Sequence, residues 1–106
     1  MSHFGAGEFA CRCCGLIHVR KELVDALDEL RRRFGFPIVI TSGYRCPPHN
    51  KAEGGEPDSY HLFGMAADLA RLDGPIDELY TAAMETTSLT FVKHGQTFIH
   101  VDIRER

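Results

Sequence analysis

Hydrophobic residues recur along the chain at two different spacings, and these spacings predict its secondary structure. From residue 20 to residue 34 the apolar positions recur every three or four residues, and charged residues fill most of the gaps. These apolar positions are Leu23, Leu27, Leu30 and Phe34. The pattern predicts an amphipathic helix. Gly35 and then Pro37 follow, which is the usual order of signals at a helix C-terminus.

Two short runs around the middle of the chain predict strands. Residues 38–41 are β-branched and lie between Pro37 and a Ser-Gly pair, as expected of a buried strand. Residues 66–70 are small apart from Leu69 and Asp68, and Asp68 shares its face of the strand with alanines. A second helix is expected after them, capped by Asp73 and running to about Glu85.

The C-terminal part reads as a hairpin. Residues 89–92 and 97–103 are the expected strands, joined by a short turn at residues 94–96. Alternation in the second strand places Ile99, Val101 and Ile103 toward the core, and Phe98, His100 and Asp102 on the opposite face. Together the elements predict an α+β fold, with about two helices packed on a small antiparallel sheet.

Composition narrows the class of protein. The 106 residues are 43% hydrophobic and 25% charged, as expected of a single globular domain over residues 1–106. The net charge of −3 and the lack of basic runs other than residues 31–33 argue against nucleic acid as a partner. No segment has the length or composition of a membrane span or a signal peptide, so we expect a soluble monomer.

Three residues in the second half of the chain are candidate metal ligands. Residues 42–64 form a polar stretch far longer than an ordinary connection, and such loops are often functional. It contains His61, Asp68 follows on the next strand, and His100 lies on the last one. Hydrolytic zinc sites commonly use three ligands of His and carboxylate type, which leaves one position open for water. These residue types therefore favour a zinc hydrolase.

Several motifs together resemble the M15 family of zinc D-alanyl-D-alanine peptidases, and in particular its small, phage-associated branch. The likeness extends from about Phe9 to the C-terminus. The motifs are residues 42–45, Pro47, His49, Asn50, residues 54–55, residues 59–68 and residues 98–102.

The resemblance implies a fold of the D-Ala-D-Ala peptidase and hedgehog type, with zinc bound by His61, Asp68 and His100. It assigns Arg45 to a substrate carboxylate or the reaction oxyanion, which suits a planar guanidinium, and Ser59 to a hydrogen bond with substrate. The implied activity is hydrolysis in the stem peptide of bacterial peptidoglycan, by a carboxypeptidase or an endopeptidase acting in the cell wall or periplasm.

One position departs from the family pattern. Many members carry an acidic general base three residues before the last His ligand, where this chain has Thr97. Asp102, on the strand face of His100, could act as the base or orient that ligand. His94 is the other candidate. The departure also leaves open a catalytically silent, zinc-containing domain that binds the wall or has a structural role.

Four cysteines allow three interpretations. Cys11, Cys13, Cys14 and Cys46 could be reduced thiols, could form a disulfide to Cys46, or could hold a structural metal. Adjacent Cys13 and Cys14 are a poor disulfide pair. We expect reduced or partly paired thiols, and the sequence leaves the redox state open.

Overall fold

One antiparallel sheet organises the chain. The structure is a computed structural model and describes residues 4–57 and 59–104. Within these residues four strands form the sheet in the order β1-β2-β4-β3, and every neighbouring pair is antiparallel. The strands are β1 (Ile38–Ser42), β2 (Ala66–Arg71), β3 (Phe91–His94) and β4 (Ile99–Asp102). The two central strands are therefore β2 and β4.

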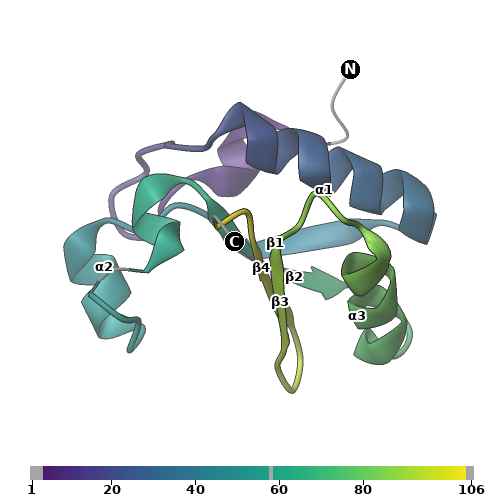
Figure 1. Cartoon of the computed structure of the whole chain (residues 1–106). Helices are drawn as coiled ribbons and strands as arrows, with labels where there is room; N and C mark the ends of the chain where they lie inside the picture. The colour runs from purple at the N-terminus through teal and green to yellow at the C-terminus, as the bar shows by residue number, and fades with distance from the viewer. Residues whose placement is uncertain (1–3, 58, 105–106) are drawn as a thin grey trace.

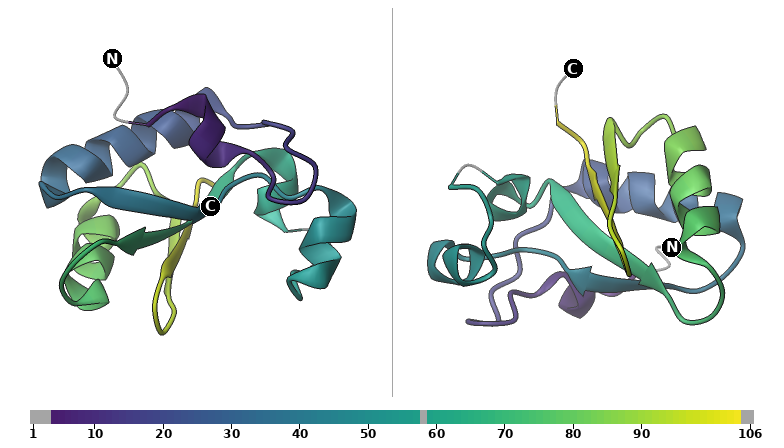
Figure 2. Two further views of the ribbon diagram at one scale, coloured as in Figure 1. Left: turned by 180° about the vertical axis from the view of Figure 1, so that it is seen from behind. Right: turned by 90° about the horizontal axis from the view of Figure 1, so that it is seen from below.

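Helices lie on different sides of this sheet (Figure 1). The long helices α1 (Lys21–Phe34) and α3 (Ile76–Glu85) contact each other, and α3 also contacts the central strands. The short helix α2 (Pro47–Ala52) and the 3-10 turn η2 (Tyr60–Phe63) lie away from α3, across the sheet (Figure 2). A further 3-10 turn, η1 (Ala6–Phe9), precedes α1. The α+β expectation is confirmed.

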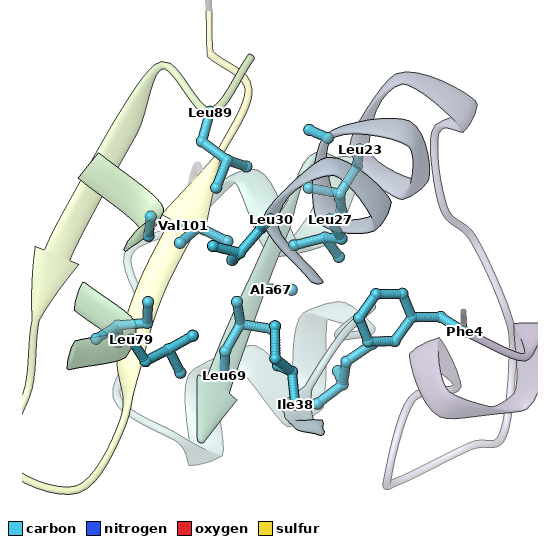
Figure 3. Packing of buried hydrophobic residues seen from close by; sticks show 14 of the residues in the cluster. Phe4, Leu23, Leu27, Leu30, Ile38, Ala67, Leu69, Leu79, Leu89 and Val101 are labelled. Atoms are coloured by element: carbon cyan, nitrogen blue, oxygen red, sulfur yellow. The ribbon is translucent and has the colours of Figure 1, made fainter. Parts of the chain in front are cut away.

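The hydrophobic core fills the space between α1, α3 and the sheet (Figure 3). Leu23, Leu27 and Leu30 of α1 are fully buried, as their helical spacing predicts. Ile99 and Val101 meet them from β4 with no exposed surface. The other face of β4 is thereby left for polar side chains.

The end of α1 follows the expected signals. Gly35 adopts the left-handed conformation (φ 83°) and its N–H donates to the carbonyl of Arg31. Arginines 31–33 occupy the last turn, where positive charge interacts favourably with the helix dipole. This fixes the direction in which the chain enters β1.

The stretch 42–64 is more regular than the loop we expected. It contains α2 and η2, with Pro47 at the start of α2, where a missing N–H costs nothing. The Gly and Pro content concealed these short elements because each spans barely more than one helical turn. Both position residues of the candidate site.

Several boundaries also differ from expectation, and both hairpin strands begin two residues later than predicted, at Phe91 and Ile99. Helix α3 begins at Ile76 with Pro75 at the cap position, so the assignment of Asp73 as the cap was wrong. His94 belongs to strand β3 rather than to the turn, which is closed by the N–H of Gly95 donating to the carbonyl of Phe98 (2.8 Å). Turn residues seldom reveal strand ends to within one or two positions.

Strand β1 carries a bulge beside the candidate site. Ile40 pairs with Leu69, but Ser42 pairs with Asp68, so Thr41 is an extra residue in the ladder. The next residue, Gly43, passes so close to the N-terminal segment that an added Cβ would lie 2.6 Å from the Cα of Phe9. The bulge re-aims the chain toward the site, as bulges commonly do.

We predict that Gly43→Ala lowers the free energy of unfolding by about 1–3 kcal/mol, because the new methyl group must displace backbone. Denaturant titration measures the change. Gly7→Ala is the matched control, since nothing lies within 4 Å of a Cβ at that position. Equal stability of the two variants would contradict the close approach.

Candidate metal centre

Strand pairing brings two of the candidate ligands together. Asp68 of β2 is the Cα partner of His100 of β4, so their side chains project from the same face of the sheet. The Nδ1 atom of His100 lies 3.0 Å from Asp68 Oδ1. This face is opposite to the one that packs Ile99 and Val101 into the core.

The third candidate, His61, comes from η2. Ser59 precedes this turn and its hydroxyl accepts the N–H of His61 (3.2 Å), while Gly64 ends it in the left-handed conformation (φ 69°). The His61 side chain is buried, and its Nε2 atom lies 3.3 Å from Asp68 Oδ1. One ligand atom from each of His61, Asp68 and His100 fits within 4.8 Å of the others.

The outer nitrogen of each imidazole is already occupied. His61 Nδ1 lies 2.8 Å from the carbonyl oxygen of Gly43, and His100 Nε2 lies 2.9 Å from Asp102 Oδ2. The carbonyl oxygen of Gly43 and the carboxylate oxygen of Asp102 can only accept a hydrogen bond. In the neutral tautomers, these two ring nitrogens therefore carry the N–H. The inner nitrogens then donate to the Asp68 carboxylate when the rings are charged, and present lone pairs beside it when the rings are neutral.

Two imidazole nitrogens and a carboxylate oxygen that converge in this way favour positive charge between them. Protons on the imidazoles supply this charge in part, and a single metal ion supplies it for all three groups. The set is borderline in softness, with two imidazoles and one carboxylate, as in hydrolytic zinc sites. The residues present therefore fit a zinc ion.

The charge balance of the cluster agrees with this fit. Burial opposes ionisation of Asp68, but hydrogen bonds and charge from His100 and His61 hold its pKa well below the ordinary range. Burial also disfavours the charged form of His100, yet Asp102 and Asp68 raise its pKa. Together the carboxylates favour positive charge in the space between the ligand atoms.

Asp102 orients His100 from behind. Its side chain is fully buried, and it accepts hydrogen bonds from His100 Nε2 and from the backbone and side chain of Arg104. Burial raises the pKa of Asp102, but the contacts with His100 and Arg104 outweigh it and lower the pKa to about 2. A carboxylate that fixes the ring of a ligating histidine is a common feature of zinc sites.

Arg45 contacts the remaining oxygen of the central carboxylate. Its NH2 atom lies 3.0 Å from Asp68 Oδ2, and its Nε donates to Ser42 Oγ (3.0 Å). Its NH1 donates to Oδ1 of Asn50 (3.4 Å), a buried residue of α2. The bulge in β1 and the helix α2 thus aim the guanidinium at the site.

An open cleft of about 640 Å³ adjoins the cluster. Arg45 and Ser59 line it beside the three candidate ligands. Its other walls include residues that the sequence did not single out, among them Glu53, Glu56, Tyr60, Lys93, Phe91 and Arg104. Peptide-sized groups can therefore approach the candidate ligands from solvent.

Thr97 and Phe98 follow the turn of the β3–β4 hairpin, and His94 precedes it. His94 lines the cleft with its Nε2 held 2.6 Å from Asp77 Oδ1, and its Nδ1 faces the carbonyl oxygen of Gly95. Both of its ring nitrogens therefore face acceptors. Phe98 lies on the cleft wall and is exposed.

Comparison with known families gives a clear result. A family profile described as Peptidase M15 matches residues 2–102. The chain belongs to the peptidase M15 family. The comparison with curated proteins gives no match. Across the part of the chain that the structure describes, no helix has the length and apolar character needed to cross a membrane.

Arg104 is the residue of this M15 site that sequence reasoning missed most clearly. His100, Asp102 and Arg104 are spaced two residues apart. The strand alternation that placed the first two on one face therefore predicted the same face for Arg104. Its guanidinium stacks on the ring of Phe91 (3.8 Å to the centroid) and on that of Tyr60 (4.7 Å). No side-chain pattern could indicate the role of Gly43, because its backbone carbonyl group makes the contact with His61.

We predict that His61→Ala and His100→Ala each lower the zinc content of the M15 chain by one equivalent, because two remaining ligands do not hold the ion. Elemental analysis of the purified proteins measures this. His94→Ala is the control and keeps its zinc, since its ring contacts Asp77 and Gly95 instead. Unchanged zinc in both ligand variants would rule out this cluster as the metal site.

We further predict that Asp102→Asn weakens zinc binding by about 10- to 100-fold, the scale for a partner that orients a metal ligand. Competition with a chelator gives the affinity. Asp77→Asn serves as the matched variant, because Asp77 also bonds a histidine, His94, that lies outside the cluster. Equal affinities of the two variants would show that Asp102 does not orient His100.

Proposed function

We propose that this M15 peptidase uses zinc to hydrolyse peptide bonds in the stem peptide of bacterial peptidoglycan, as a D-alanyl-D-alanine carboxypeptidase or a related endopeptidase. The observation that carries the proposal is the convergence of His61 Nε2, Asp68 Oδ1 and His100 Nδ1 on one point beside an open cleft. We expect it to act as a monomer in the cell wall or periplasm, in the manner of a phage endolysin.

The three proposed ligands contribute different types of donor atom to the ion. Asp68 supplies the negative charge, and the two imidazoles supply neutral donors whose orientation is set by Gly43 and Asp102. When bound, zinc supplies a Lewis acid for the scissile carbonyl and a means of activating water near neutral pH. The site opens into the cleft on its remaining side, where substrate and water can enter.

Arg45 is the proposed anchor for a substrate carboxylate or for the oxyanion. A guanidinium has five N–H donors, and contacts with Ser42, Asn50 and Asp68 use three of them. The other two are available at the cleft that Arg45 lines. A stem peptide ends in a carboxylate, which matches a planar donor of this kind.

Ser59 is the proposed second contact with substrate. Its oxygen accepts the N–H of His61, so its own hydroxyl hydrogen is left to donate toward the cleft. The same side chain thereby links the position of a metal ligand to the position of the substrate.

Four residues at or beside the cleft are candidates for the general base. Asp102 is fully buried and both of its oxygens accept hydrogen bonds, which favours the orienting role over the base role. His94 can accept a proton only after its ring leaves Asp77 or Gly95. Glu53 and Glu56 line the cleft and add two carboxylates to the candidates.

The competing function is a catalytically silent wall-binding or structural domain. It is favoured by Thr97, which stands where many members have an acidic base. Zinc content does not distinguish the two functions, because both retain the metal. The decisive experiment incubates the zinc-loaded protein with purified muropeptides and identifies products by mass.

Products that require zinc and are lost in His61→Ala support the peptidase, and their masses distinguish removal of a terminal D-alanine from cleavage of an internal bond. A product pattern identical in the wild type and His61→Ala, at full zinc loading of the wild type, would support the silent domain instead.

In the same assay we predict that Arg45→Lys keeps its zinc and lowers kcat/KM by about 10- to 100-fold, since an ammonium cannot reproduce the planar, charge-assisted contacts. Arg32→Lys, an exposed position of α1, is the control for the same chemical change. An unchanged kcat/KM in Arg45→Lys would remove this residue from substrate binding.

A further inference from the structure

Three cysteines form a second cluster away from the cleft. The sulfur atoms of Cys11, Cys14 and Cys46 all lie within 4.8 Å of one another, and no disulfide joins any of them. Cys11 is buried, Cys46 is half-buried and Cys14 is exposed. Tetrahedral zinc with thiolate ligands places sulfur atoms about 3.8 Å apart, given Zn–S bonds of about 2.3 Å. The cluster therefore needs only small side-chain movements to reach that spacing.

The first two cysteines lie on one tight turn. The N–H of Gly15 donates to the carbonyl of Cys11 (2.9 Å), and the N–H of Cys11 donates to the carbonyl of Leu16 (2.8 Å). Gly15 adopts φ 78°, a conformation that favours glycine. The turn brings Cys11 and Cys14 to the same side, with the Cys-x-x-Cys spacing of many zinc ligands.

The third cysteine is held against this turn by backbone contacts. The N–H of Tyr44 donates to the carbonyl of Phe9 (2.9 Å), and the N–H of Cys46 points to the sulfur of Cys11 (3.4 Å). Residues 9–11 and 44–46 therefore lie side by side although they are far apart in sequence. The cluster is a built feature of the fold rather than a chance meeting of mobile side chains.

We propose that Cys11, Cys14 and Cys46 bind a second zinc ion with a structural role. Three soft thiolates select a metal such as zinc over magnesium or calcium. Cys13 lies outside the group of three.

The second ion would connect the N-terminal segment to the hydrolytic site. Cys46 directly follows Arg45, whose guanidinium contacts Asp68. Fixing Cys46 to the turn at Cys11 limits the movement of the segment that carries this arginine. The inference does not depend on the proposed peptidase activity, because it concerns other residues and another role.

Cobalt substitution tests the site directly. Apo-protein prepared under reducing conditions is titrated with Co²⁺, which gives a near-ultraviolet charge-transfer band only when thiolates ligate it. We expect the band in the wild type, and its loss in Cys14→Ser and Cys46→Ser. Cys13→Ser is the matched control and keeps it. The His61–Asp68–His100 site has no thiolate and cannot produce this band.

Zinc analysis provides the second measurement. We expect two equivalents per chain in the wild type, one in Cys46→Ser and one in His61→Ala, which would retain the thiolate site. Absence of the cobalt band in the wild type would overturn the proposal, and so would a disulfide within the cluster under these conditions. Loss of the band in Cys13→Ser would overturn the choice of the three ligands.

The outcomes also separate this inference from the proposed function. A protein that hydrolyses muropeptides but holds one zinc at the His61 cluster contradicts only the thiolate site. A protein that holds two zinc ions but leaves muropeptides intact contradicts only the peptidase.

Discussion

The buried carboxylate of Asp68 is the interaction on which the rest of the site depends. It lies on a central strand, where one of its oxygens faces two imidazoles and the other accepts from Arg45. A buried carboxylate is costly unless positive or donor groups compensate it. The elements around it are arranged to supply that compensation: η2 brings His61, β4 brings His100, and the segment after the β1 bulge brings Arg45.

A second layer fixes the orientation of these groups. The carbonyl of Gly43 and the carboxylate of Asp102 occupy the outer nitrogens of the histidines, and Arg104 in turn neutralises Asp102. Asp102 ends β4, whose opposite face packs into the core, and Gly43 follows β1 and packs against the N-terminal segment. Ligand geometry is therefore set by packing that is remote from the ligands themselves, as expected of a preorganised site.

Much of this arrangement could be predicted from the sequence, for reasons that lie in particular residues. The spacing of leucines in α1 and the alternation in β4 revealed which faces are buried. The family resemblance predicted that His61, Asp68 and His100 lie together, as they do. The helix α2 and the 3-10 turn η2 were missed because elements of fewer than two turns in a Gly- and Pro-rich stretch show no periodicity to detect. The roles of Gly43 and of the cysteine turn were also hidden, since they arise from backbone contacts between segments remote in sequence.

The pairing of Asp68 with His100 has a consequence for how the protein acquires its metal. These residues are 32 positions apart, and they become neighbours only when β4 joins β2. Nonlocal strand pairing of this kind forms late and slowly compared with helices, because distant parts of the chain must first meet. The nascent chain thus has no complete site to offer the ion. A metal ion bound by these residues would therefore enter after the sheet has formed, and it would add a link between β2 and β4 on the face opposite the core.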